Sequence, residues 1–224
     1  MSEPRMVEVR RKVLKENDLL AGQLRDRFHR AGTRVISLVS SPGSGKTTLL
    51  ERLLTDLRRE HRVAALVGDL ATENDAARLA RSGAPVKQIT TGTVCHLDAS
   101  MVERALSDWP LEELDYLFIE NVGNLVCPSS FDLGEDLRLV LVSTTEGEDK
   151  PLKYPTIFNT ADVAIITKMD MAEAAGIDLD LLVRNIHGVR PGMPILKVSS
   201  RSRQGVGELE QLLMAARDEA VAQS

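Results

Sequence analysis

Short apolar runs recur along this chain, separated by polar turns or by stretches with helical spacing. The runs that predict strands cover residues 34–39, 63–67, 116–120, 137–142, 163–167 and 195–198. Helices are predicted over residues 1–31, 47–60 and 206–223. In the first of these helices, apolar side chains recur largely at every fourth position from Val9 to Phe28. Strands that alternate with helices predict an α/β fold whose mainly parallel sheet is joined by right-handed crossovers.

The amino-acid composition supports this architecture. Hydrophobic residues make up 43% of the chain but aromatic residues only 3%, so Leu, Val, Ile and Ala must fill the core, as in parallel sheets covered by helices. Gly32 and Thr33 interrupt the helical pattern near the N-terminus. We therefore expect an N-terminal helical arm, residues 1–31, followed by one α/β domain, residues 32–224.

The charge pattern restricts the classes of partner. A formal net charge of -5 argues against nucleic acid, because neutralising phosphates requires a net basic face. The first thirty residues are rich in arginine and lysine but also contain several acids, which favours a solvated amphipathic helix over an anion-docking site.

No run approaches the roughly 18 consecutive apolar residues of a membrane span, and the N-terminus lacks the apolar core of a signal peptide. We therefore expect a cytoplasmic protein with no membrane partner. The chain contains two cysteines, Cys95 and Cys127, and a disulfide between them is not expected in a reducing compartment. Metal binding and simple burial stay open for both.

A glycine-rich turn follows the first predicted strand and opens the next helix. Its sequence, Ser40-Ser41-Pro42-Gly43-Ser44-Gly45-Lys46-Thr47, is close to the Walker A pattern, with Ser40 in place of the first glycine. Backbone N–H groups in such a loop surround nucleotide phosphates at a helix N-terminus, which predicts a P-loop NTPase fold of three layers. Lys46 would reach the terminal phosphates, and the Thr47 hydroxyl would hold Mg²⁺. The residues expected to contact the nucleotide here are Gly43, Ser44, Gly45, Lys46, Thr47 and Thr48.

A magnesium site in such a fold also needs an acid, usually at the end of a strand. Glu120 ends the apolar run Tyr116–Ile119 and is the first candidate. Asp75, in the polar loop Thr72–Asp75 that is placed to act as a switch, is a second magnesium candidate, although it could simply face water. Asp69 follows the second strand and is a candidate for positioning the attacking water, although it could instead cap a helix.

Thr167-Lys168-Met169-Asp170 follows a strand where GTPases carry Asn-Lys-x-Asp. The Asp170 carboxylate can accept two N–H groups of guanine that adenine does not offer, and the Lys168 stem can pack along the base. Thr167 replaces the asparagine that normally ties this loop to the phosphate loop, which predicts weaker guanine binding. Ser199 and Ser200, after the last strand, are expected to form a second guanine-binding loop.

A thiol and an imidazole are adjacent in Cys95-His96, and a second thiol follows at Cys127. Neighbouring side chains converge on one ion only at a turn or at the start of a helix. Thiolates and imidazole suit Zn²⁺ or Ni²⁺, but these three donors leave a four-coordinate ion one ligand short, which a second subunit could supply. Asp98 is either a further ligand or the cap of the following helix.

Several stretches of the chain resemble the hydrogenase nickel-incorporation GTPase family, HypB. They are the Walker loop with Thr48, Thr90–Ala99, Glu120–Pro128, Phe131–Glu135 and Glu146–Pro155. The last three are far more specific than the Walker loop, and the resemblance covers nearly the whole chain.

The resemblance implies a GTPase that forms a GTP-dependent homodimer and binds nickel or zinc through Cys95, His96 and Cys127 near the interface. It also implies delivery of nickel to the large-subunit precursor of nickel–iron hydrogenase, together with a small zinc-containing nickel chaperone. The alternatives are a GTPase that serves another metalloenzyme, such as urease or a cobalamin-dependent mutase, and an interaction module without catalysis.

Overall fold

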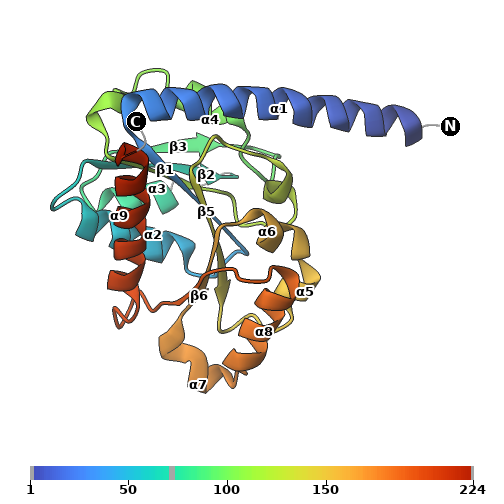
Figure 1. Ribbon diagram of the computed structural model, residues 1–224, viewed down its shortest axis with the longest axis vertical. Coiled ribbons are helices and arrows are strands. Elements are labelled where there is room, and N and C mark those ends of the chain that lie inside the picture. Colours follow the sequence, from blue (N-terminus) through green and yellow to red (C-terminus); the bar gives the residue numbers. More distant parts are fainter. Residues whose placement is uncertain (1–2, 71–73, 223–224) are drawn as a thin grey trace.

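The computed structural model of the protein describes residues 3–70 and 74–222, and within these ranges its strands form one sheet (Figure 1). The strand order is β3-β2-β4-β1-β5-β6-β7, and every neighbouring pair is parallel. The strands are β1 (Arg34–Ser40), β2 (Val63–Asp69), β3 (Val86–Thr90), β4 (Tyr116–Glu120), β5 (Leu137–Ser143), β6 (Val163–Thr167) and β7 (Ile195–Lys197). The predicted parallel α/β sheet is therefore confirmed.

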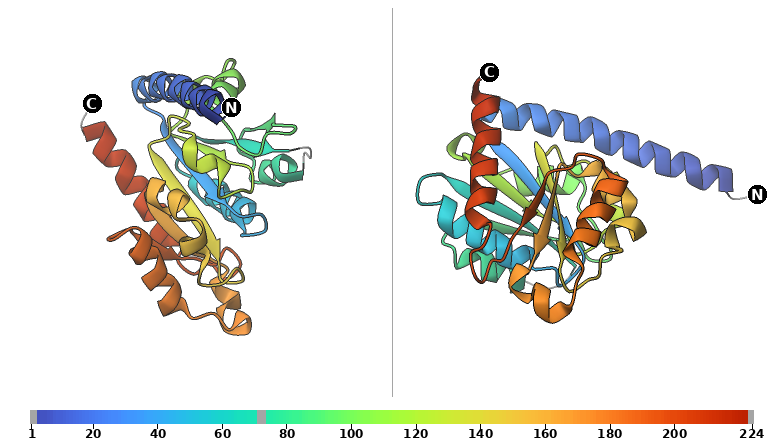
Figure 2. Two further views of the ribbon diagram at one scale, coloured as in Figure 1. Left: turned by 90° about the vertical axis from the view of Figure 1, so that its right-hand side faces the viewer. Right: turned by 60° about the horizontal axis from the view of Figure 1, so that its bottom comes forward.

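Helices cover both faces of the sheet, so the domain has three layers (Figure 2). On one face, α2 (Lys46–Leu57), α3 (Asn74–Ala80) and α9 (Val206–Ala222) share a core with alternate strand residues such as Leu38. The opposite face is covered by α1 (Glu3–Ala31), α4 (Ala99–Ala105), α6 (Pro155–Thr160) and α8 (Leu179–Val189). The remaining helices are short: α5 (Lys150–Lys153), α7 (Ala172–Ala175), η1 (Leu111–Glu113), η2 (Cys127–Ser130) and η3 (Met169–Met171).

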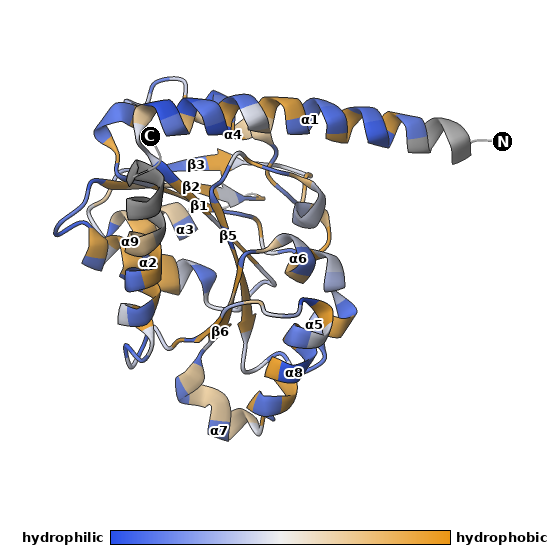
Figure 3. Ribbon diagram, in the orientation of Figure 1, coloured by the Kyte–Doolittle hydropathy of each residue, from blue (hydrophilic) through white to orange (hydrophobic). Residues whose placement is uncertain are grey.

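The core is mainly aliphatic, as the composition predicted. Strand residues alternate between the two faces because successive side chains of a strand point in opposite directions. Ile36 and Leu38 of β1 join one core, whereas Val35 and Val39 join the cores of the other face. In Figure 3 hydrophobic colours run through the central strands, whereas the helices alternate between hydrophobic and hydrophilic residues. Among the described helices, none is long and apolar enough to cross a membrane.

The N-terminal helix α1 is present as predicted, but only its second half packs on the domain. Ala21, Leu24 and Phe28 are fully buried, whereas Val9 and Val13 on the same apolar stripe are about half exposed. Figures 1 and 2 show that the first half of α1 extends beyond the sheet. The division of the chain at residue 31 stays a prediction.

The sequence analysis did not predict the edge strand β3. Its five residues, Val86–Thr90, include Lys87 and Gln88 and are half buried or exposed, so they lack the apolar run that marks the inner strands. β3 pairs with β2 alone, in the register Ala65↔Val86 to Asp69↔Thr90.

Candidate functional site

The loops at the carboxyl end of the sheet enclose a cavity of about 570 Å³. Open parallel sheets bind ligands at this end, where the strand order changes direction. The walls of the cavity come from the Walker loop, the end of β2, α3, the loop after β4 and the loop after β6. The lining residues are Ser41, Pro42, Gly43, Ser44, Gly45, Lys46, Thr47, Thr48, Asp69, Leu70, Asp75, Arg78, Val122, Gly123 and Lys168.

The Walker loop turns from β1 into α2 through two glycines with left-handed backbones, Gly43 (φ 74°) and Gly45 (φ 92°). Residues with a Cβ atom rarely adopt such angles, so this turn depends on glycine. Ser40 does not have a positive φ and is buried at the end of β1, where its hydroxyl donates to the Ser41 carbonyl. The replacement of the first Walker glycine by Ser40 therefore causes no backbone strain.

A buried ion pair lies at the base of the cavity. The Lys46 ammonium is 2.7 Å from Glu120 Oε1, and the Thr47 hydroxyl donates to the same oxygen at 2.6 Å. The two charged side chains are 10% and 1% exposed. Glu120 Oε2 is buried and has no hydrogen-bond partner among the residues that the structure describes. A carboxylate with an unused oxygen beside a threonine hydroxyl is a donor set that suits Mg²⁺.

The two aspartates expected near the phosphates both line this cavity. Asp69 is the last residue of β2, and its Oδ1 accepts the N–H of Leu70 at 2.7 Å. Asp75 lies in the first turn of α3 rather than in a loop, while Thr72 and Glu73 lie outside the described residues. The roles of both aspartates stay predictions.

The candidate base-reading loop is fastened directly to the Walker loop. Thr167 donates its hydroxyl to the Ser44 carbonyl at 2.6 Å, and Thr144 donates its hydroxyl to the Lys168 carbonyl at 2.9 Å. Lys168 has a left-handed backbone (φ 57°), and its stem lies against Gly45. Thr167 thus supplies the connection that we expected it to lose by replacing asparagine.

Asp170 is held by the second expected base loop. The buried Ser199 hydroxyl donates to Asp170 Oδ1 at 2.6 Å, and the backbone N–H of Met169 donates to the Val198 carbonyl. Asp170 itself is exposed, and Ser200 follows at a half-buried position. The carboxylate is therefore oriented while it stays accessible to a ligand.

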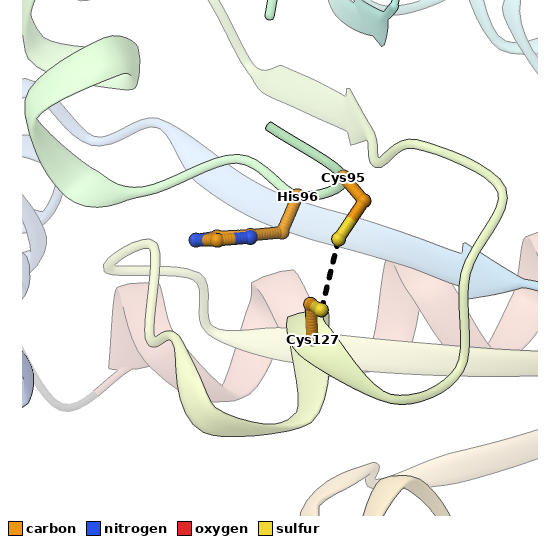
Figure 4. Close-up of side chains that lie close together, drawn as sticks. All are labelled: Cys95, His96 and Cys127. Carbon is orange, nitrogen blue, oxygen red and sulfur yellow. Dashed lines mark hydrogen bonds between the residues drawn. The ribbon is translucent and has the colours of Figure 1, made fainter. Parts of the chain in front are cut away.

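Cys95, His96 and Cys127 come together although they belong to different loops (Figure 4). Cys95 and His96 lie between β3 and α4, and Cys127 begins η2. The two sulfur atoms are 2.9 Å apart, and one ligand atom from each of the three residues lies within 4.8 Å of the others. His96 stacks on Phe131 with a centroid distance of 4.0 Å, and its Nδ1 is buried without a hydrogen-bond partner in ranges 3–70 and 74–222. These donors fit a soft or borderline metal ion.

The pKa values of His96 and Cys127 are shifted in opposite directions. Burial lowers the pKa of His96, so its imidazole is neutral at neutral pH and can bind a metal. The hydrogen bond that Cys127 shares with Cys95 keeps the proton on Cys127 and so raises the pKa of Cys127, and burial adds to this effect. A metal ion bound here must therefore displace the thiol proton of Cys127.

The loop after β4 contacts both the cavity and the thiols. Gly123 packs so closely on the Walker loop that a Cβ atom would lie 3.1 Å from Pro42 Cα. Asn121 Oδ1 accepts the Leu97 N–H at 3.1 Å, and Asn124 Nδ2 donates to the Cys95 carbonyl at 3.2 Å. Sequence reasoning did not assign these three residues a role, although they lie inside the stretch Glu120–Pro128 on which the resemblance partly depends.

Asp98, in the loop between β3 and α4, has a structural role. Its carboxylate accepts the Met101 N–H at 2.8 Å and so caps the N-terminus of α4. Of the two readings left open, capping is the one that the contacts support.

Comparison with known proteins agrees with this geometry. A family model for the CobW/HypB/UreG nucleotide-binding domain matches residues 34–197, from the start of β1 to the end of β7. The chain belongs to the CobW/HypB/UreG family. Its relatives in this family include the hydrogenase maturation factor HypB of Azotobacter chroococcum mcd 1, which is 46% identical over 210 residues, covering 93% of this chain and 68% of that protein.

Two further members of the CobW/HypB/UreG family extend the comparison. The hydrogenase/urease maturation factor HypB of Helicobacter hepaticus is 44% identical over 211 residues, covering 92% of this chain and 86% of that protein. The crystal structure of HypB from Helicobacter pylori in complex with nickel is 43% identical, with a TM-score of 0.86 over 91% of this chain and 96% of that one. The resemblance to HypB and the P-loop fold are confirmed.

The contact between Thr167 and Ser44 leads to a first prediction. Thr167→Val keeps the shape of the side chain but leaves the buried Ser44 carbonyl without its donor, and the lost bond is worth about 0.5–1.5 kcal/mol. We expect nucleotide affinity to fall about 2- to 12-fold, measured by titration with a fluorescent GDP analogue. Thr167→Ser keeps the hydroxyl and should bind like the wild type. Equal affinities for the valine variant and the wild type would contradict the proposed connection.

Proposed function

We propose that this chain is a GTP-hydrolysing metallochaperone that binds nickel or zinc and delivers nickel during maturation of nickel–iron hydrogenase. The observation that carries the proposal is the course of one loop. Residues 120–127 begin at the acid beside Lys46 and Thr47 and end at the thiol that contacts Cys95. The names of the relatives as hydrogenase maturation factors, and a nickel complex of one HypB, support the same function.

The phosphate chemistry would depend on electrostatic stabilisation, because phosphoryl transfer asks mainly for positioning and charge neutralisation. Lys46 would turn from Glu120 toward the terminal phosphate, and Glu120 and Thr47, with Asp75 nearby, would hold Mg²⁺, which neutralises phosphate charge when bound. Asp69, at the cavity wall, would orient the attacking water. No strong general base is proposed, so we expect slow turnover.

The base would be read by Asp170, with Lys168 packed along its plane and Ser199 and Ser200 beside it. The hydrogen bond from Ser199 orients the carboxylate, which supports a preference for guanine. A non-catalytic interaction module would not need this oriented carboxylate together with a buried Walker lysine.

The metal ion would be bound by Cys95, His96 and Cys127. Nickel would be the cargo, and zinc would be a second metal ion that the site can bind. Three donors are one short of a tetrahedral set, which supports a shared site in a GTP-dependent homodimer. The proposed partners are the small zinc-containing nickel chaperone and the hydrogenase large-subunit precursor. Free thiols that bind metal fit the reducing cytoplasm that we propose as its location.

Urease is a second candidate target, because the relative from Helicobacter hepaticus is named for hydrogenase and urease maturation together. The two targets can be separated by supplying the nickel-loaded protein with GTP to each apoenzyme and measuring which one gains nickel. Transfer to urease apoprotein alone would reject the hydrogenase assignment.

Replacing Lys46 tests the phosphate site. Lys46→Ala should reduce GTP turnover to background, because the terminal phosphate loses its main cation. The measurement is phosphate release from GTP at saturating Mg²⁺, and the same assay is run with ATP. The melting temperature is measured in parallel, because the variant leaves the buried Glu120 unpaired. Lys87→Ala, which breaks a surface pair with Asp108, should hydrolyse GTP at the wild-type rate. Wild-type turnover by Lys46→Ala would overturn the assignment.

Replacing Asp170 tests the choice of base. Asp170→Asn removes a charged acceptor and offers an amide that accepts at one atom only, so GTP affinity should fall more than about tenfold. The preference for GTP over xanthosine triphosphate should shrink or reverse. Both affinities are measured by competition, and an unchanged ratio would mean that the guanine is read elsewhere.

Replacing either thiol tests the shared metal site. Cys95→Ala and Cys127→Ala should weaken nickel and zinc binding by similar factors, because both sulfur atoms face the same point. GTP binding should persist in both variants, and His187→Ala, which removes a histidine hydrogen-bonded to the Met193 carbonyl, should bind metal normally.

If a nucleotide changes metal affinity, the metal must change nucleotide affinity by the same factor. A metal affinity that does not change with the bound nucleotide would contradict a coupling between the nucleotide site and the metal site.

A further inference from the structure

The stretch Phe131–Glu135 has no role in the phosphate or base loops, although it is part of the resemblance to HypB. In the structure it forms the loop that follows η2 and runs against α1. Gly134 (φ 80°) approaches the helix so closely that a Cβ atom would lie 2.8 Å from the Ala21 carbonyl oxygen. Arg25 donates from Nη2 to both carboxylate oxygens of Asp132, at 2.7 and 2.8 Å. This loop is therefore one of the parts of the domain against which α1 packs, together with α4 and β1.

The same loop is fixed to the sheet by a buried acid. Glu135 Oε1 accepts the Ser37 hydroxyl at 2.9 Å and the Arg138 Nε–H at 2.7 Å, and Glu135 Oε2 accepts the Leu133 N–H at 2.8 Å. A buried carboxylate with this many partners holds its loop in one conformation. At the other end of the loop, Phe131 stacks on the candidate metal ligand His96.

Asn17 of α1 joins this loop to the other metal-binding segment. Asn17 lies at the middle of α1 and is 8% exposed, whereas residues 8–16 before it are exposed or half-buried. Nδ2 donates to the Asp132 carbonyl at 2.9 Å, and Oδ1 accepts the Ala99 N–H at 2.9 Å. Ala99 begins α4 shortly after Cys95 and His96, and Asp132 follows Cys127 closely, so one amide connects the two segments that carry the thiols.

We propose that α1 is a structural support for the candidate metal site and that Asn17 is its positioning residue, which sets the distance between the two thiol-bearing segments. The proposal rests on the metal site of the proposed function. Asn121 and Asn124, from the loop after β4, already hydrogen-bond to the segment that carries Cys95 and His96. Asn17 adds a separate connection from the N-terminal helix. Mutation of the outer-shell groups that orient metal ligands commonly weakens metal binding 10- to 100-fold.

The test compares Asn17→Leu and Asn17→Asp with a control on the same helix, using the full chain. Asn17→Leu removes both hydrogen bonds, and Asn17→Asp keeps the acceptor for Ala99 but loses the donor to Asp132. Arg27→Ala, whose guanidinium donates to the Leu106 carbonyl at the far end of α4, is the control. Nickel and zinc affinities, the nickel–thiolate absorption band, GDP affinity and the melting temperature are measured for each variant.

We expect Asn17→Leu to weaken nickel and zinc binding about tenfold and to alter the nickel–thiolate band, with GDP affinity unchanged. Asn17→Asp should show a smaller loss, and it carries the test if the leucine variant does not fold. Wild-type metal affinity in the Asn17 variants would overturn the proposal. A fall in GDP affinity or an equal loss in Arg27→Ala would also overturn it, since either result would indicate a general loss of structure.

A second readout separates this inference from the proposed function. In metal-free protein, diamide converts the Cys95 and Cys127 thiols to a disulfide and is itself reduced to the hydrazine, at a rate that depends on how often the thiols meet. Asn17→Leu should slow this step several-fold relative to Arg27→Ala. If Cys95→Ala leaves metal binding intact, the metal site is wrong, and the disulfide rate still decides whether Asn17 positions the thiols. An unchanged rate would show that it does not.

Discussion

The position of β4 between β1 and β2 is the constraint on which both sites depend. Parallel pairing aligns Glu120 with Leu38 on one side and with Val67 on the other, so β4 ends beside the Walker loop and beside the loop after β2. A carboxylate buried at this point would be costly alone, and the Lys46 ammonium compensates its charge. The ion pair therefore holds the Walker lysine in place at the base of the cavity.

The same strand position brings the metal ligands within reach of the nucleotide pocket. After Glu120 the chain passes Pro42 of the Walker loop at Gly123, contacts the Cys95 carbonyl through Asn124, and arrives at Cys127. Each contact is short and local, so a change at the phosphates needs no long relay to reach a thiol. In the proposed function this loop is the element with two arrangements that a nucleotide-dependent switch requires.

Sequence reasoning succeeded where the signal is local and failed where it depends on tertiary contacts. The buried inner strands and the Walker turn carry apolar runs and glycines that can be recognised without a structure, whereas the half-exposed β3 carries neither. The meeting of Cys95 with Cys127 depends on the strand order β3-β2-β4, which no spacing along the chain encodes, and it was predicted from the resemblance to HypB alone. Thr167 is instructive because its hydroxyl reaches Ser44 across 123 positions, so the expected loss of a connection was wrong.

The contacts of α1 show why a helix that extends beyond the domain can still matter for chemistry inside it. Each hydrogen bond of Asn17 contributes only about 1 kcal/mol to stability, which a buried core of this size tolerates losing. Metal coordination is far less tolerant, because ligand distances must agree within about 0.2 Å. Two bonds that are minor for folding are therefore sufficient to control a site whose donors come from separate loops. The first half of α1, with Val9 and Val13 exposed, is connected to that site through the same helix.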